Sequence, residues 1–130
     1  PEIGKPIAQQ TIHEALHGKR TLIFTGGTGN PFFTTDTNAV LRSLQIQAHE
    51  IWKGTHVDGI YTKDPHKYPD AQRLERVTYM QAINDKLGVM DLTAYAMADQ
   101  FKQRIRIFDI FAPDALLKAA ENKNYGSIIA

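Results

Sequence analysis

Residues 13–17 of the chain read HEALH, a pattern that can hold zinc in a peptidase. On a helix, this H-E-x-x-H spacing places two imidazoles one turn apart with a carboxylate between them. A catalytic zinc site also needs a third protein ligand. Gly18 is expected to end the helix at once, and the extended motif would have its third histidine at position 23, which is Ile23. We therefore expect His13 and His17 to be solvent-facing polar residues, with a zinc peptidase kept as an alternative.

A glycine-rich loop, TGGTGNPFFTTD at residues 25–36, carries side chains and backbone groups suited to an anionic ligand. Thr34 and Thr35 stand where a helix is expected to begin, and the free N–H groups and the dipole of a helix start favour an anion. Phe32 and Phe33 offer flat faces against which a nucleobase or a sugar can pack. The same residues also suit a plain strand-to-helix turn, with Thr35 as the cap and one phenylalanine buried. Both interpretations stay open on these grounds.

Asp36 distinguishes this loop from a simple phosphate site. The loop is not a P-loop, because no Gly-Lys-Ser/Thr follows it, and it lacks the G-x-G-x-x-G spacing of dinucleotide sites. A carboxylate in the first turn of a helix complements the helix dipole. It can also hold cationic side chains around a phosphoryl group that is being transferred. A plain anion site gains little from an added negative charge, so Asp36 indicates more than binding.

Helical and strand-like segments alternate along the chain and would position this loop. Helical patterns cover residues 6–17, 34–46, 78–88, 92–103 and 115–121, and strand-like patterns cover residues 21–24, 50–55, 60–62, 104–110 and 126–130. This alternation predicts an α/β fold of three layers around a mostly parallel sheet. Ligands of such sheets bind at the carboxyl ends of the strands. The loops at residues 25–36 and 53–65 are therefore the expected binding segments.

Composition restricts the function further. The chain has 130 residues, a net charge of +1 and no cysteine, so disulfides, thiolate nucleophiles and cysteine metal sites are excluded. The charge indicates no general attraction to nucleic acid, and no apolar run approaches the length of a membrane span. The chain begins at Pro1 rather than Met, from which we expect a processed chain or a piece of a longer protein.

Several motifs resemble one known family. GGTGNPFFTTDT, at residues 26–37, resembles the uridylate-binding loop of bacterial UMP kinases, and KGTHVDGIYTKDP, at residues 53–65, is similar to a nucleotide-site segment shared more loosely across the amino acid kinase family. LGVMDLTAYAMA and NYGSIIA, at residues 87–98 and 124–130, match in kind and order. The resemblance runs from about Thr21 to the C-terminus. It implies an amino acid kinase (carbamate kinase-like) fold, with residues 1–130 forming its C-terminal half and the N-terminal side incomplete.

The resemblance implies phosphoryl transfer from ATP to UMP, giving UDP and ADP, in pyrimidine nucleotide biosynthesis. Asp36 corresponds to an aspartate that organises the transfer centre, and Thr55, Tyr61 and Asp64 correspond to ATP contacts. Mg²⁺ is expected with ATP, with no metal ligand assigned to the chain itself. The UMP contacts that the resemblance implies are Thr28, Gly29, Asn30, Pro31, Phe32, Phe33, Thr34 and Thr35.

Some positions depart from the family pattern or stay open. His56 stands where the family usually has lysine, and Asp109 and Asp114 stand where asparagine and glycine are more usual. Lys53 is either a phosphate contact or a surface lysine, and Asp91 is either a helix cap or a catalytic group.

The resemblance also bears on partners and on activity. It implies a cytoplasmic homo-oligomer, a hexamer as is typical of bacterial UMP kinases, with GTP and UTP as candidate regulators and no nucleic acid or membrane partner. The phosphate-gripping lysine and glycine-rich loop of the family's N-terminal half are missing from these residues, so we expect the chain alone to be inactive. A non-catalytic nucleotide-binding or regulatory module is the main alternative. A kinase acting on aspartate or glutamate is disfavoured, because two adjacent aromatics suit a base better than an amino acid.

Overall fold

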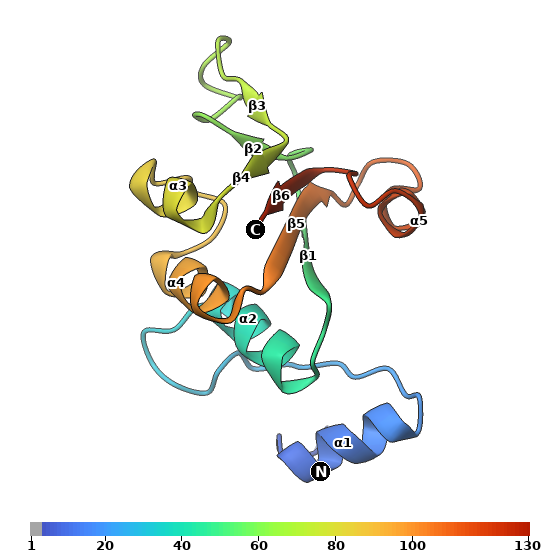
Figure 1. The fold of residues 1–130 in the computed structure, drawn as a ribbon. Helices are drawn as coiled ribbons and strands as arrows, with labels where there is room; N and C mark the ends of the chain where they lie inside the picture. Colours follow the sequence, from blue (N-terminus) through green and yellow to red (C-terminus); the bar gives the residue numbers. More distant parts are fainter. Residues whose placement is uncertain (1–3) are drawn as a thin grey trace.

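A computed structural model describes residues 4–130 and contains one four-stranded sheet with a small two-stranded arm (Figure 1). The sheet has the order β1-β5-β6-β4. The β1–β5 and β4–β6 pairs are parallel and the β5–β6 pair is antiparallel, so the sheet is mostly parallel as predicted. The antiparallel arm pairs β2 with β3 and projects from the end of the sheet. The strands are β1 (Glu50–Thr55), β2 (Ile60–Tyr61), β3 (Arg73–Leu74), β4 (Arg76–Val77), β5 (Arg104–Asp109) and β6 (Ser127–Ile129).

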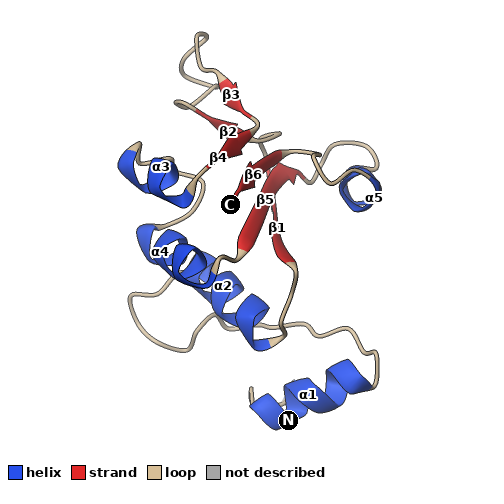
Figure 2. Ribbon diagram, viewed as in Figure 1, coloured by secondary structure: helices blue, strands red, loops and turns tan. Residues whose placement is uncertain are grey.

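The helices complete the predicted three layers (Figure 2). Helices α2, α3 and α4 lie on one side of the sheet, α5 lies on the other, and α1 lies beyond the end of α2. Among residues 4–130, no helix is both long and apolar enough to cross a membrane. The helices are α1 (Gln9–His17), α2 (Thr35–Gln45), α3 (Tyr79–Asn84), α4 (Leu92–Phe101) and α5 (Ala115–Glu121).

The alternation of side chains along β5 explains why both faces of the sheet are covered. Ile105 and Ile107 are buried in the cluster that includes residues of α2, α3 and α4, whereas Phe108 is buried against α5. Successive side chains of a strand point to opposite faces. Arg106 shares the α5 face with Phe108, and its guanidinium donates to backbone carbonyls of α5 and of the turn that follows and pairs with Glu50 of β1. Apolar burial and the hydrogen bonds of Arg106 to backbone carbonyls therefore hold α5 against the sheet, whereas the ion pair with Glu50 joins β5 to β1.

Most of the predicted helices and strands are present, but several begin or end at other residues than predicted. Helix α1 begins at Gln9 rather than at position 6, and its buried residues are Ile12 and Ala15. Helix α3 ends at Asn84 rather than at position 88, because the chain turns through Lys86, which has a φ of +49°. Helix α4 ends at residue 101 rather than 103, because Lys102 adopts the left-handed conformation that terminates many helices.

The predicted strand at residues 21–24 is wrong. These residues form no strand in the structure, and the side chain of Ile23 is 85% exposed. A strand is stable only where a neighbouring strand accepts its backbone hydrogen bonds. No strand within residues 4–130 pairs with this segment. The segment therefore has a residue composition typical of strands, but no strand in the described part of the chain pairs with it.

Candidate functional site

The loop before α2 has the backbone of a tight, exposed ligand loop. Gly26, Gly27 and Gly29 have φ values of +79°, +64° and +77°, a region that glycine adopts at little cost. Phe32 also has a positive φ, +69°, which is rare for a bulky residue. Phe32 is fully exposed and Phe33 is about half exposed. The alternative of a structural turn with one buried phenylalanine is therefore wrong, and both rings are free to meet a ligand.

The start of α2 is capped by Thr34, one residue earlier than the alternative with Thr35 as the cap. The Thr34 hydroxyl accepts hydrogen bonds from the backbone N–H groups of Asp36, at 3.1 Å, and Thr37, at 3.4 Å. Thr35 is the first helical residue. Nearby, the Thr28 hydroxyl accepts a bond from the Asn30 N–H at 3.1 Å, which tightens the loop upstream.

Asp36 forms an ion pair with Lys53 of β1. The Lys53 Nζ lies 2.7 Å from Asp36 Oδ1, and each side chain is about a quarter exposed. The same Nζ donates to the backbone carbonyl of Val89. Lys53 is therefore not a simple surface lysine, because its ammonium bridges the first turn of α2 and the segment before α4.

Asp91 joins the N-terminal ends of two helices. Its carboxylate caps α4 by accepting from the Ala94 N–H at 2.8 Å, as the helix-cap interpretation predicts. It also accepts hydrogen bonds from the hydroxyls of Thr34 and Thr37 at the start of α2. Burial by itself raises the pKa of Asp91, but these hydrogen bonds outweigh burial and leave the pKa below its ordinary value. Asp91 is thus ionised at neutral pH and contacts the glycine-rich loop directly.

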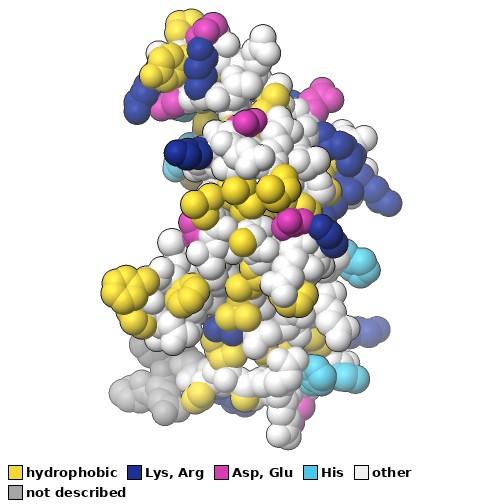
Figure 3. Space-filling view, turned by 60° about the vertical axis from the view of Figure 1, so that its left-hand side comes forward, with side chains coloured by type: hydrophobic (Ala, Val, Ile, Leu, Met, Phe, Trp, Pro, Cys, Tyr) yellow, Lys and Arg dark blue, Asp and Glu magenta, His cyan; other side chains and the backbone are white. Residues whose placement is uncertain are grey.

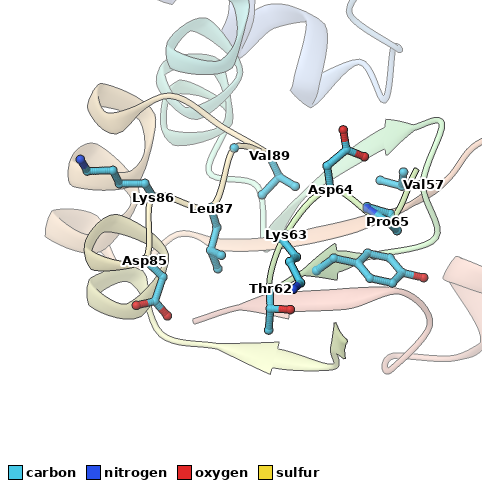
Figure 4. A pocket seen from close by; sticks show the side chains of 12 residues that line it. Val57, Thr62, Lys63, Asp64, Pro65, Asp85, Lys86, Leu87 and Val89 are labelled. Atoms are coloured by element: carbon cyan, nitrogen blue, oxygen red, sulfur yellow. The ribbon is translucent and has the colours of Figure 1, made fainter. Parts of the chain in front are cut away.

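A cavity of about 360 Å³ lies beside this junction, between two segments that face each other (Figure 4). Residues 57–65, with the start of the β2–β3 arm, form one wall, and residues 85–89 form the other. Leu87 and Val89 point toward the opposite wall, whereas Lys86 points away from it. The volume is within the usual range for small-molecule sites.

Two of the three predicted ATP contacts line the cavity, and the third does not. Tyr61 and Asp64 line the cavity. The Tyr61 hydroxyl donates to Asp58 Oδ1 at 2.7 Å, and this hydrogen bond is the main cause of the raised pKa of Tyr61. Thr55 is absent from the cavity lining. Its hydroxyl instead bonds both the N–H and the carbonyl of Val57, each at 2.9 Å, and so shapes the turn that brings Val57 into the wall.

Charged side chains of both signs gather on the arm, at the top of Figure 3. Lys63 lines the cavity, pairs with Asp70 at 2.6 Å and lies over the ring of Tyr68. Lys67 lies 3.5 Å from Asp64. These pairs are exposed and contribute little to stability, but they give the cavity a polar rim.

Sequence reasoning missed the Lys53 contact and the wall at residues 85–89. A signal for Lys53 was present, because alternate residues of a strand share a face. Ile51 is buried in the main core beside α2, so Lys53, two residues later, points to the same side. No comparable pattern marks residues 85–89, whose place depends on how α3 is joined to α4.

The HEALH segment lies on α1, away from this junction. The ring centroids of His13 and His17 are 6.4 Å apart, and His17 Nδ1 lies 2.9 Å from the His13 carbonyl. Both side chains are exposed. Within residues 4–130, no three His, Cys, Asp or Glu side chains are grouped so that they could hold a metal. The zinc hypothesis therefore lacks its third protein ligand in the described chain.

The three positions that depart from the family pattern shape one end of the sheet. His56 stacks on Phe111, with ring centroids 4.6 Å apart and an interplanar angle of 13°. Asp109 accepts from the Phe111 N–H at 2.9 Å. Asp114 precedes α5 with a φ of +58°, and its side chain forms no cap hydrogen bond there. The family's more usual glycine adopts such a φ more easily than aspartate does.

Comparisons with known proteins agree with the geometry. The family model described as "Amino acid kinase family" matches residues 3–109. The chain is 43% identical over 123 residues to the uridylate kinase of Francisella tularensis subsp. holarctica (strain LVS), covering 95% of this chain and 49% of that protein. It is 43% identical over 130 residues to the uridylate kinase of Rhodopseudomonas palustris (strain BisA53), covering 100% of this chain and 55% of that protein. The chain thus spans about half the length of these relatives.

Solved structures with the same fold carry related names. The UMP kinase from Bacillus anthracis superposes with a TM-score of 0.91 at 25% identity, covering 96% of this chain and 52% of that one. The UMP kinase from Ureaplasma parvum gives a TM-score of 0.88 at 33% identity, covering 95% and 53%. The described fold is therefore about half of the fold seen in those proteins.

Proposed function

The chain belongs to the amino acid kinase family, and from this premise we propose that the complete protein is a UMP kinase that converts UMP and ATP to UDP and ADP. The observation that carries the proposal is the position of the Asp36–Lys53 pair. It stands at the end of the glycine-rich loop, and through Lys53 it contacts Val89 in the wall of the cavity. Phosphoryl transfer between two nucleotides needs both to be held in one geometry, and a charged pair that contacts both binding segments supports this arrangement.

The glycine-rich loop is the proposed UMP site. The exposed rings of Phe32 and Phe33 are available to a uracil or ribose face. The positive end of the α2 dipole favours the phosphate of the nucleotide there, although the Asp36 and Thr37 N–H groups already donate to the Thr34 hydroxyl. The proposed contacts are Thr28, Gly29, Asn30, Pro31, Phe32, Phe33, Thr34 and Thr35.

The cavity is the proposed ATP site. Tyr61 and Asp64 line it and supply a ring and a carboxylate that can accept hydrogen bonds from the adenosine part. Thr55 is assigned here through the turn that it forms with Val57. The donor phosphates would then extend toward Val89 and Lys53, and the second nucleotide would lie on the other side of Lys53, at the glycine-rich loop.

The chemistry needs position and charge more than a base. Phosphoryl transfer is catalysed mainly by alignment and electrostatic stabilisation, and the acceptor is already a phosphate. Asp36 is therefore proposed to orient the Lys53 ammonium rather than to remove a proton. Mg²⁺ bound to ATP would neutralise phosphate charge. We expect this ion to be held mainly by the nucleotide phosphates.

Properties of the whole protein follow from the family alone. We expect a homo-hexamer, regulation by GTP and UTP, a role in pyrimidine nucleotide biosynthesis and a cytoplasmic location.

Titration and turnover on the purified chain test the function. We expect ATP and UMP to bind, with little or no UDP formed, because the chain spans only about half of its relatives. A non-catalytic nucleotide-binding module would show the same binding, but it would remain inactive when the other half of the domain is supplied. Absence of any nucleotide binding would contradict both assignments, and rapid UDP formation by the chain alone would contradict its expected inactivity.

A further inference from the structure

One ammonium group contacts both halves of the candidate site. Lys53 Nζ lies 2.7 Å from Asp36, which is 17 positions away, and donates to the carbonyl of Val89, which is 36 positions away. Asp36 belongs to the first turn after the glycine-rich loop, and Val89 belongs to the cavity wall. Lysine has three N–H donors on a flexible stem, so a single side chain can serve both segments.

The surroundings hold this ammonium in place. Its side chain is 26% exposed and that of Asp36 is 25% exposed, so water screens the pair only in part. The stem leaves β1 on the face that carries buried Ile51. A mobile surface lysine loses much side-chain entropy when it is fixed, whereas a partly buried one loses less, because packing already limits its conformers.

A second route, which contains no cation, joins the same segments through α4. The Tyr95 hydroxyl, on α4, donates to the Leu87 carbonyl in the cavity wall at 2.9 Å. At the start of the same helix, Asp91 accepts hydrogen bonds from the Thr34 hydroxyl of the loop. The loop and the wall are therefore connected twice, and only the Lys53 route places a positive charge between them.

We propose that Lys53 couples the two nucleotide sites, an inference that rests on the proposed function. It holds Asp36 and residues 85–89 in one arrangement. The first nucleotide to bind therefore orders part of the site for the second, and the ammonium offsets the repulsion between their phosphates. Removing the ammonium lowers the factor by which one nucleotide strengthens the binding of the other. Couplings of this kind usually span about 5- to 150-fold in affinity.

The first test needs no nucleotide. Amide hydrogen exchange is measured for the wild-type chain, for Lys53→Met and for Lys102→Met. Lys102 is a matched control, because it also pairs with an aspartate, Asp99 at 2.5 Å, but at the exposed end of α4. We expect Lys53→Met to raise exchange in residues 85–90 and in the first turn of α2, and Lys102→Met to leave both unchanged. If amide exchange in both segments of Lys53→Met is the same as in the wild type, Lys53 does not hold the two segments together.

The second test measures the coupling itself. UMP is titrated by calorimetry with and without a non-hydrolysable ATP analogue, and the ratio of the two dissociation constants is compared between variants. We expect this ratio to shrink about fivefold or more in Lys53→Met and to stay at the wild-type value in Lys102→Met. If circular dichroism shows that Lys53→Met does not fold, Lys53→Arg is used in its place. Because Lys53→Arg keeps the cation, we then expect only a partial loss of coupling.

The outcomes separate the inference from the proposed function. If both nucleotides bind and the ratio is the same in wild type and Lys53→Met, the coupling role is wrong and the proposed function stands. If the wild-type chain binds neither nucleotide, the proposed function fails, and with it the coupling role.

Discussion

Lys53 and Asp36 form an ion pair of 2.7 Å between a strand and the first turn of a helix, and the same lysine contacts Val89 in a cavity wall. The pair lies between a glycine-rich loop with two exposed phenylalanines and a cavity with a tyrosine and an aspartate in its walls. Removing one member of such a pair leaves the other charge without its partner.

In the complete protein, Asp36→Asn should lower the kcat of the proposed UMP kinase reaction by about 100-fold or more, the usual cost of removing a preorganised electrostatic group. The neutral amide no longer orients the Lys53 ammonium toward the transferring phosphoryl group. Steady-state UDP formation measures the effect. Asp99→Asn, which alters an exposed ion pair on α4, serves as the control and should retain wild-type kcat. A kcat within twofold of wild type for Asp36→Asn would remove this residue from the transfer centre.

Tyr95→Phe should destabilise the chain by about 1 kcal/mol, because the buried phenol loses its hydrogen bond to the Leu87 carbonyl. Urea unfolding followed by circular dichroism gives the free energy of unfolding. Tyr68→Phe, at a half-exposed ring on the arm, is the matched control and should change stability by less than about 0.5 kcal/mol. Equal stabilities for Tyr95→Phe and the wild type would show that the bond contributes nothing net.

The stability that Tyr95 contributes should also depend on pH in the alkaline range. Burial raises the pKa of Tyr95 to about 12 in the folded chain, whereas an unfolded tyrosine has a pKa of about 10. A raised folded pKa means that the contribution is complete below about pH 10 and is lost as the pH rises toward 12. The difference in unfolding free energy between wild type and Tyr95→Phe should therefore shrink over this interval. A difference that stays constant from pH 9 to pH 12 would argue against burial as the cause.

The stability that Asp91 contributes should be lost at acidic pH, whereas that of Tyr95 is lost at alkaline pH. The pKa of Asp91 is lowered in the folded chain, so its ionised form stabilises the fold above the unfolded pKa of about 4. This contribution is lost as the pH falls through the lower, folded pKa. The stability difference between wild type and Asp91→Asn should be largest near neutral pH and should shrink below about pH 4. Acid unfolding curves of the two chains, compared at matched ionic strength, check the sign.

The double variant His13→Ala/His17→Ala should bind UMP and ATP as the wild type does. Both side chains are exposed on α1, away from the candidate site, so we expect a stability change within about 0.5 kcal/mol for each. Calorimetry measures the binding, and metal analysis after dialysis measures zinc. Stoichiometric zinc in the wild type that is lost in the double variant would revive the peptidase hypothesis.

Much of the local structure could be predicted from the sequence, because its causes are local. Thr78 and Asp91 cap α3 and α4 by accepting N–H bonds three residues ahead, and these are short-range patterns. The short strands β1, β5 and β6 were predicted from their apolar, β-branched composition. The ends of α3 and α4 were predicted less well, since they depend on Lys86 and Lys102 adopting a left-handed backbone.

Residues 21–24 show the limit of local reasoning. The segment has strand composition, yet it forms no strand in the structure, because the hydrogen bonds of a strand belong to a neighbour that may lie anywhere in the chain.

For this chain, the sequence alone determined the α/β class, the family motifs and the two loops that carry the candidate nucleotide contacts. These depend on residue types and short spacings. Only the tertiary structure decided that Lys53 bridges Asp36 and Val89, that residues 85–89 form the second cavity wall, and that Asp91 joins the starts of α2 and α4. Each of these contacts joins segments that are far apart in sequence, and it forms only when the packing of α2, α4 and β1 brings them within hydrogen-bonding distance.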